Sequence, residues 1–301
     1  MSDRTPGRSL ARTLVMGILN VTEDSFSDGG EWIDPDRAVA HARAMVAAGA
    51  DIIDIGGEST RPGATRVDAA VEAARVVPVI SALAADGVTV SVDTMRASTA
   101  EAAVEAGASI VNDVSGGLAD PDMYRVVAEA NRTREVDYCL MHWRAERFES
   151  AAGRADHAGG VLADVTGHLT ELADRAQSAG IPGERIILDP GLGFAKDADD
   201  NWSLLHGLDE VSALGHRVLV GASRKRFLTA LRPEEDGAPA AADSAAADQA
   251  TAALTALVAS DGVWAVRVHD VASNRAAVDV AHAVTTGRGP ALPEGWRARR
   301  G

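Results

Sequence analysis

Eight short apolar runs recur along the whole chain. Their starts lie on average about 36 residues apart, a spacing that leaves room for one helix after each strand. Most runs are near-continuous stretches of Val, Ile and Leu, which is typical of strands buried on both faces. The runs are Leu14–Asn20, Ile52–Gly57, Val88–Asp93, Ser109–Val114, Val136–His142, Arg185–Pro190, Arg217–Gly221 and Val263–Asp270.

Ala-rich segments with apolar residues three and four apart separate these runs and predict helices. They are Asp36–Ala48, Arg66–Ala85, Ala97–Ala106, Val161–Ala179 and Gln249–Ser260. Asp34 and Pro35 form a typical helix start, and Gly49, Gly87, Gly107, Gly180 and Gly262 stand where helices should end. Eight strand–helix units predict an α/β protein, a single-domain (β/α)8 TIM barrel. The alternative is an open doubly wound sheet, but no GxGxxG motif follows the first run.

The domain plan has one barrel between two tails. We expect a flexible N-terminal tail over residues 1–13, the barrel over 14–284 and a flexible C-terminal tail over 285–301. Residues 232–247 are acidic and rich in Ala and Pro, without apolar periodicity until their end, and predict an inserted loop after a short helix at Lys225–Leu231.

Composition narrows the class of protein. There are 44 acidic and 29 basic residues, a net charge of −15, and this acidic balance argues against a nucleic-acid partner. The one cysteine, Cys139, excludes an intrachain disulfide and is expected in the core. No apolar run is long enough to span a membrane, and the polar N-terminus does not look like a secretory signal. A cytoplasmic setting is the expectation.

The predicted strands end in polar residues. In a barrel enzyme the carboxyl ends of the strands carry the active site, so these residues should face one ligand. They are Asn20, Glu58 to Arg61, Asp93, Asn112 and Asp113, Met141 and His142, Asp189, Ser223 to Lys225, and Arg267 with His269. Eight converging polar ends favour a polar ligand over isolated caps and turns.

Two carboxylates, an amide and an ammonium suit a flat heterocycle with a guanidine-like edge. They are Asp93, Asn112, Asp189 and Lys225, and Phe194 could supply an apolar wall. Only two of the 29 basic residues are lysines, Lys225 and Lys196, so a retained lysine indicates a need for a compact ammonium, although chance remains open. The alternative for each aspartate is a strand-end ion pair.

Anion sites are predicted at two places. Ser223 precedes a predicted helix N-terminus, which favours a carboxylate or phosphate there; the alternative is a simple Ser N-cap. Asn20, Arg61, Arg267 and His269 together suit a diphosphate, with the Asn20 oxygen available to Mg²⁺. A structural salt bridge is the alternative for Arg267. The Gly-containing segments Val21–Gly30 and Glu58–Ala64 look like mobile lids or ordinary barrel loops.

Several blocks of this sequence resemble dihydropteroate synthase, in the order of that family and over about residues 14 to 282. They are Met16–Gly30, Asp54–Gly63, Val92–Arg96, Asn112–Gly117, Asp189–Phe194, Val220–Phe227 and Arg267–Val271. The segment MHWR at Met141–Arg144 is similar to the actinobacterial type. Two features depart from the family: Glu23 stands where proline is common, and the reaction does not explain the insert.

The resemblance implies a pterin-binding barrel, a transferase of folate biosynthesis. The family joins 6-hydroxymethyl-7,8-dihydropterin diphosphate to p-aminobenzoate, giving 7,8-dihydropteroate and diphosphate. By motif position, the pterin would be bound by Asp93, Asn112, Met141, Asp189, Phe194, Lys225 and Arg267. The diphosphate would be bound by Asn20, Arg61, Arg267 and His269, and p-aminobenzoate by Phe26, Thr60, Pro62 and Ser223.

The family also implies a chemistry and partners. Asn20 would ligate Mg²⁺, and Asp28, Arg61 and Lys225 would be the catalytic residues of a dissociative, SN1-like substitution. Sulfonamides would compete with p-aminobenzoate, and the protein would be a homodimer. Three rivals remain: a paralogue that binds a pterin without condensing it, a methyltetrahydrofolate methyltransferase on the same barrel, and an interaction scaffold.

Overall fold

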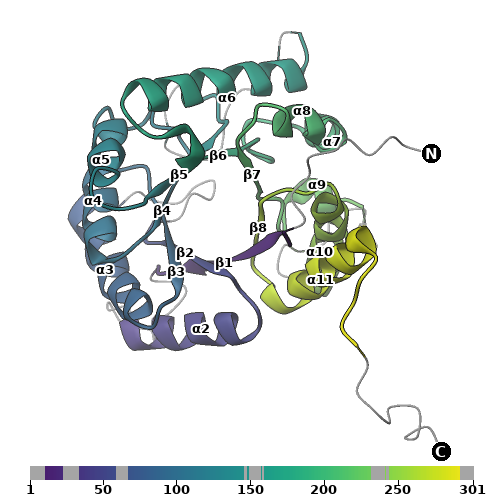
Figure 1. Ribbon diagram of the computed structural model, residues 1–301, viewed down its shortest axis with the longest axis horizontal. Helices are drawn as coiled ribbons and strands as arrows, with labels where there is room; N and C mark the ends of the chain where they lie inside the picture. Colours follow the sequence, from purple (N-terminus) through teal and green to yellow (C-terminus); the bar gives the residue numbers. More distant parts are fainter. Residues whose placement is uncertain are drawn as a thin grey trace, which may run out of the picture.

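The computed structural model describes residues 11–22, 34–58, 67–145, 148, 157, 159–231, 241 and 244–291. Its eight strands are all parallel and close into a barrel in chain order, with helices around the outside (Figure 1). The first strand pairs with both the second and the eighth, which closes the sheet. The predicted TIM barrel is therefore confirmed, and the open doubly wound sheet is wrong.

Each predicted apolar run contains one strand, and seven of the eight strands are shorter than predicted. The strands are β1 (Leu14–Asn20), β2 (Ile52–Gly56), β3 (Thr89–Asp93), β4 (Ile110–Asp113), β5 (Asp137–Met141), β6 (Ile186–Asp189), β7 (Arg217–Val220) and β8 (Ala265–Val268). The trimmed residues lie at the strand ends, where the chain turns away to the helices and to the mouth of the barrel.

Helices occupy the predicted intervals and several that had no prediction. They are α2 (Pro35–Ala47), α3 (Ala69–Ala85), α4 (Ala97–Ala106), α5 (Met123–Ala130), α6 (Val161–Ser178), the 3₁₀ turn η1 (Gly183–Arg185), α7 (Ala198–His206), α8 (Leu208–Ser212), α9 (Arg226–Thr229), α10 (Ala245–Ser260) and α11 (Val271–Thr286). The helices α5, α7, α8 and α11 had no individual prediction; α5, α7 and α8 are short, at eight, nine and five residues, whereas α11 has 16.

Two predicted helix boundaries, the start at Asp34 and the end at Gly107, are present in the structure. Asp34 caps α2 by accepting from the backbone N–H of Asp36 at 2.9 Å, and Pro35 opens that helix. Gly107 ends α4 in the left-handed region at φ 116°, a conformation that costs a residue with a Cβ.

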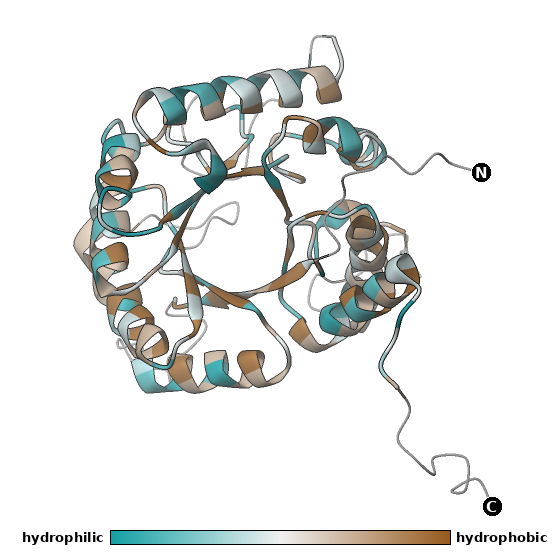
Figure 2. Cartoon of the chain, in the orientation of Figure 1, coloured by the Kyte–Doolittle hydropathy of each residue, from teal (hydrophilic) through white to brown (hydrophobic). Residues whose placement is uncertain are grey.

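Apolar side chains fill the barrel and separate its two ends. Figure 2 shows largely brown, hydrophobic strands inside a ring of helices that alternate between teal and brown. A buried cluster crosses the interior below the carboxyl ends of the strands and includes Met16, Ile52, Ile110, Cys139, Ile187, Leu219 and Ala265. The core position predicted for Cys139 is confirmed. This apolar cluster lies directly beneath the polar groups at the carboxyl ends of the strands.

Two boundaries differ from the predicted domain plan. Thr13 is buried and its hydroxyl donates to the Val263 carbonyl at 2.8 Å, so the barrel holds residues before position 14. Ser244 caps α10, so residues 245–247 are helical rather than part of the loop, and α11 extends the barrel through Thr286. The rest of the insert, apart from Ala241, lies outside the described residues. In the part of the chain that the structure describes, none of the helices combines the length and apolar character needed to cross a membrane.

Candidate active site

The strand register brings three predicted site residues to one end of the barrel. Asn20 is the register partner of Gly56, and Gly56 in turn is the partner of Asp93. Asp93 is then the partner of Asn112 on the next strand. Parallel strands present their carboxyl ends at the same edge, so side chains far apart in sequence share one layer.

Two glycines leave space between the polar side chains of this layer. A Cβ on Gly56 would lie 3.7 Å from the Asp93 Cβ and 3.8 Å from Asn20 Oδ1. A Cβ on Gly221 would lie 3.5 Å from Asp189 Oδ2 and 4.0 Å from the Arg267 Cβ. A Cβ at either position would touch these side chains at ordinary van der Waals distance, so each glycine leaves the room of one methyl group beside them.

Arg267 on β8 lies at the centre of the polar layer. Its Nε lies 2.6 Å from Asp54 Oδ2, and its Nη2 lies 2.7 Å from Asp93 Oδ2. The amide of Asn112 donates to the same Asp54 oxygen at 3.1 Å. The salt bridge that remained an alternative for Arg267 is thus present, as is the ion pair that was the alternative for Asp93. Arg267 keeps 22 % of its side chain exposed at the mouth, so pairing and ligand contact are compatible.

Asp54 is the site residue that the sequence analysis did not assign. It is fully buried on β2, and its Oδ1 has no hydrogen-bond partner among the described residues. A single carboxylate inside the otherwise apolar run IIDIGG was the available signal. A buried carboxylate needs a partner, and that partner is a cation near the other end of the chain.

The carboxylates of the mouth favour protonation more than free aspartates do. Burial raises the pKa of Asp93 to about 7; Arg267 opposes this shift and Asp54 adds to it. Burial also raises the pKa of Asp189, against the attraction of Lys225. Asp93 can therefore donate or accept a hydrogen bond near neutral pH, which suits a heterocycle with both N–H and ring-nitrogen positions.

Lys225 joins the polar layer to the loop after β6. Its ammonium donates to the Leu192 carbonyl and lies 4.9 Å from the centroid of the Phe194 ring. Burial lowers the pKa of Lys225 to about 8, while Asp189 raises it. A desolvated ammonium of this kind binds strongly to a carbonyl or ring nitrogen that enters the mouth.

An apolar wall stands beside these polar groups. Met141 is buried in a cluster with Met95, Val114, Trp143 and Ala195, against which Phe194 packs. The centroids of the Trp143 and Phe194 rings are 5.3 Å apart. The combination of an apolar wall and a polar layer fits a flat, polar ring.

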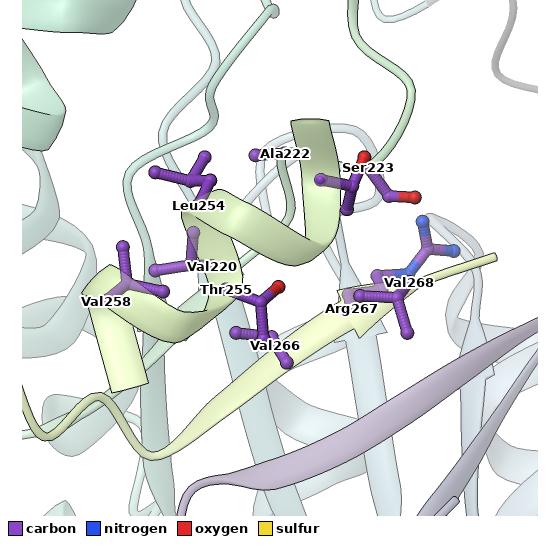
Figure 3. A pocket seen from close by; sticks show the side chains of 10 residues that line it. Val220, Ala222, Ser223, Leu254, Thr255, Val258, Val266, Arg267 and Val268 are labelled. Atoms are coloured by element: carbon purple, nitrogen blue, oxygen red, sulfur yellow. The ribbon is translucent and has the colours of Figure 1, made fainter. Parts of the chain in front are cut away.

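Ser223 and His269 form a pair at the ends of β7 and β8. Ser223 Oγ lies 3.0 Å from His269 Nδ1 and accepts from the His269 backbone N–H at 3.2 Å. Figure 3 shows Ser223 and the Arg267 guanidinium at one end of a small pocket whose other end is apolar. The cap of α9 is Lys225, so the Ser N-cap alternative is wrong, and the helix expected at Lys225–Leu231 is shorter, at Arg226–Thr229.

The structure brings nine predicted site residues to the mouth of the barrel. They are Asn20, Asp93, Asn112, Met141, Asp189, Phe194, Ser223, Lys225 and Arg267, with His269 beside Ser223. Five predicted site residues lie outside the described residues, namely Phe26, Asp28, Thr60, Arg61 and Pro62. Within the described ranges there is no group of three or more His, Cys, Asp and Glu side chains placed to hold a metal ion.

The chain matches the family model described as pterin binding enzyme over residues 16–269. It is 53% identical to the dihydropteroate synthase of Mycobacterium leprae over 90% of this chain and 92% of the relative. It is 46% identical to the dihydropteroate synthase of Bacillus subtilis over 86% of this chain and 84% of the relative.

Solved structures agree with these relatives. A Clostridium difficile dihydropteroate synthase crystallised in the presence of pteroic acid has a TM-score of 0.81 and 38% identity, covering 91% of this chain and 97% of that one. A Xanthomonas albilineans dihydropteroate synthase with 4-aminobenzoic acid has a TM-score of 0.79 and 40% identity, covering 94% and 95%. A Yersinia pestis dihydropteroate synthase in a sulfonamide drug complex has a TM-score of 0.79 and 34% identity, covering 96% and 99%.

Proposed function

The chain belongs to the pterin-binding enzyme family and is an enzyme of its dihydropteroate synthase group, and we propose that it condenses 6-hydroxymethyl-7,8-dihydropterin diphosphate with p-aminobenzoate. The products are 7,8-dihydropteroate and diphosphate. The observation that carries the proposal is the polar layer around Arg267, where Asp54, Asp93 and Asn112 lie in one hydrogen-bonded group.

The pterin is assigned to the space between the polar layer and the apolar wall. Its aminopyrimidine edge carries adjacent N–H donors, for which Asp189 and Asp93 supply oxygens and Asn112 supplies an amide. Lys225 donates to the ring carbonyl or a ring nitrogen, in place of its contact with the Leu192 carbonyl. The apolar faces of the ring lie against Met141 and Phe194.

The diphosphate is assigned to the cationic side chains at the mouth of the barrel and to the amide of Asn20. Arg267 and His269 supply donors, and Arg61, which is outside the described residues, is assigned to the same group through its motif. Guanidinium groups bind phosphate oxygens in bidentate fashion, which also neutralises the charge of the leaving group.

Mg²⁺ is assigned to Asn20, and the residues present fit it. The amide oxygen of Asn20 and the Asp93 side chain lie on either side of Gly56, which carries no side chain between them. One protein oxygen suits an ion that takes its other ligands from substrate phosphates and water. When bound, the ion would supply charge neutralisation to the departing diphosphate.

p-Aminobenzoate is assigned to Ser223, with Phe26, Thr60 and Pro62 outside the described residues. The Ser223 hydroxyl, supported by His269, is a donor for the substrate carboxylate. Sulfonamides present a comparable acidic group on an arylamine, and we expect them to compete with p-aminobenzoate here.

The substitution proceeds by a dissociative step. The bond between the exocyclic carbon and the diphosphate oxygen breaks, and the electron pair leaves with diphosphate. The electron-rich dihydropterin stabilises the cation at that carbon, with Asp28 assigned to the same role. The arylamine nitrogen then bonds to the carbon and loses a proton to water, so no strong general base is required.

The deciding experiment is dihydropteroate formation by the purified protein with both substrates and Mg²⁺. Product is expected, at a rate lowered by a sulfonamide and restored by excess p-aminobenzoate. Binding of the pterin diphosphate without product would contradict the proposal and favour the non-condensing paralogue. Omission of Mg²⁺ in a parallel assay tests the metal assignment.

Isotope scrambling tests the dissociative step. A pterin diphosphate with ¹⁸O in the bridge to the carbon should scramble that label into non-bridging positions, because a released diphosphate can rotate and return. Absence of scrambling in enzyme that turns over normally would contradict a dissociative step.

The homodimer is a further part of the proposal. Leu257 on α10 and Val280 and Val284 on α11 are each more than 60 % exposed, and these two helices pack on each other. Exposed apolar side chains on adjacent helices support a surface between two copies. Sedimentation at several concentrations should give the mass of two chains; the mass of one chain throughout would contradict it.

A further inference from the structure

Lys196 stands between β6 and α7, and its ammonium is fully engaged. Its Nζ lies 2.9 Å from the Gly191 carbonyl, 3.0 Å from the Phe194 carbonyl and 2.9 Å from His142 Nδ1. A fourth acceptor, the His142 carbonyl, lies farther away at 3.4 Å. A lysine ammonium has three N–H donors, so the three nearer acceptors are enough to use all of them. Both carbonyls belong to the loop that connects Asp189 to Lys196.

This loop passes between the two lysines of the chain. Lys196 donates to carbonyls on one side of the loop, and Lys225 donates to the Leu192 carbonyl on the other. Gly191 has φ 69°, and a Cβ on it would lie only 2.0 Å from the His142 carbonyl oxygen and 3.3 Å from Lys196 Nζ. The carbonyls of this loop thus take their directions from a left-handed backbone at Gly191 and from two ammonium groups that donate to them.

Lys196 is connected to the pterin site through two residues of the loop. The Gly191 N–H donates to Asp189 Oδ1 at 2.7 Å, and the other oxygen, Asp189 Oδ2, faces Gly221, which carries no side chain. The Phe194 carbonyl that Lys196 binds belongs to the residue whose ring lies over Lys225. A shift of Lys196 therefore moves a carboxylate and an aromatic wall together.

His142 holds the other side of Lys196. This histidine is fully buried, and burial followed by the charge of Lys196 lowers its pKa to about 2, so it is a neutral acceptor at Nδ1. Its Nε2 then carries the proton and lies 3.4 Å from Asp164 Oδ2 on α6. The same Asp164 oxygen lies 2.8 Å from His157 Nδ1. His142 Nε2 makes no hydrogen bond among the described residues, so the Asp164 carboxylate acts on it as a nearby charge. The hydrogen-bonded side of His142 is Nδ1, which faces Lys196.

We propose that Lys196 is a positioning residue for the pterin: its ammonium holds the loop from Asp189 to Phe194 so that the Asp189 carboxylate and the Phe194 ring face the substrate. The inference rests on the proposed function, because it assigns the pterin to the mouth of the barrel. Lys196 itself does not contact the pterin in this arrangement.

The charge of Lys196 connects this role to pH. Burial lowers its pKa to about 7; Lys225 lowers it further, and Asp189, Asp164 and Asp200 raise it. The other titratable groups near its partners are His142, His157 on the loop before α6, and His168 on α6. Loss of the proton removes one of three donors, so the loop should loosen as the pH rises through neutrality.

The test compares Lys196→Met with Lys196→Arg. Binding of a pterin without diphosphate is measured by calorimetry, and the KM values for both substrates are measured by the condensation assay. We expect Lys196→Met to weaken pterin binding and raise the pterin KM about tenfold, the effect of one lost charged hydrogen bond, with little change in the p-aminobenzoate KM. Lys196→Arg should keep part of the affinity, and Arg43→Met, which removes an exposed cation, is the matched control.

The pH profile separates positioning from general support of the fold. The ratio of wild-type to Lys196→Arg pterin affinity should fall between pH 6 and 8.5, because arginine does not titrate there. Equal increases in both KM values, a flat ratio, or unchanged pterin binding in Lys196→Met would each overturn the inference. If the wild-type protein binds no pterin, both the proposed function and this inference fail. If the wild-type protein binds a pterin and Lys196→Met binds it equally well, the inference alone fails.

A measurement on the wild-type protein covers the case in which the variants do not fold. Selective ¹⁵N-lysine labelling gives two side-chain NMR signals, because the chain has only Lys196 and Lys225. The Lys196 signal, assigned as the one that remains in Lys225→Met, should titrate at about pH 7, below the Lys225 signal at about pH 8. It should also shift when a pterin is added to the wild-type protein, although Lys196 lies behind the loop. A Lys196 signal that neither titrates in this range nor responds to the pterin would overturn the inference.

Discussion

Arg267 and Asp93 form an ion pair across the mouth of the barrel, with 2.7 Å between Nη2 and Oδ2, although their strands β8 and β3 are not neighbours. The ion pair therefore crosses the barrel opening and does not connect adjacent strands. The same guanidinium binds Asp54 at 2.6 Å, so one cation serves two carboxylates. The ring of strands is thereby cross-connected at the level where the substrate is expected.

Replacement of Arg267 by Met should destabilise the protein as well as inactivate it. Asp54 is fully buried and would lose its cation, and an uncompensated buried charge costs about 3 to 5 kcal/mol. Urea unfolding at pH 7 measures this loss, and the condensation assay measures activity. Arg43→Met removes a cation from an exposed pair with Asp86, and we expect little change in stability from it. Equal stability of the two variants would contradict the role given to Arg267.

The stability of the ligand-free protein should depend on pH through Asp93. Because burial raises its pKa from 3.8 to about 7, the folded protein keeps a proton that the unfolded chain has released. The contribution of Asp93 to stability therefore falls as the pH rises from about 4 to 7. Asp93→Asn cannot titrate, so its free energy of unfolding, measured from pH 4.5 to 7.5 in urea, should rise relative to wild type. Parallel curves for the two proteins would refute the raised pKa.

Lys225→Met should weaken pterin binding by about 2 kcal/mol or more, the value of a lost charged hydrogen bond in a buried site. Asp189→Ala should have a comparable effect, since its carboxylate lies at the same opening. Calorimetric titration with a pterin measures both, and circular dichroism checks that the variants are folded. Pterin affinity unchanged by either substitution would remove that residue from the ring-binding group.

Ser223→Ala should act on the second substrate. The variant loses the hydroxyl that pairs with His269 at 3.0 Å, and we expect a KM for p-aminobenzoate raised about fivefold to tenfold. The KM for the pterin diphosphate should change less, and the inhibition constant of a sulfonamide should rise with the KM for p-aminobenzoate. A change confined to the pterin KM would place Ser223 in the wrong subsite.

The sequence by itself was sufficient for the architecture, because each strand–helix unit carries a local signal. Near-continuous Val, Ile and Leu runs indicated strands covered on both faces, and the caps at Asp34 and Gly107 acted as predicted. The mouth residues could also be predicted, because polar groups at the carboxyl ends of parallel strands meet at one edge. The helices α7 and α8 were missed because their sequences are short and polar.

Only the tertiary structure decided which polar residues pair. Asp54 and Arg267 are 213 positions apart, and no local pattern connects a carboxylate in the second strand to a guanidinium in the eighth. Lys196 had no predicted role, because its three nearest acceptors belong to His142, just after β5, and to a loop whose glycines adopt left-handed conformations. Local sequence thus determined the strands and their polar ends, whereas barrel closure chose the partners, because burial makes each charge depend on whatever the fold places beside it.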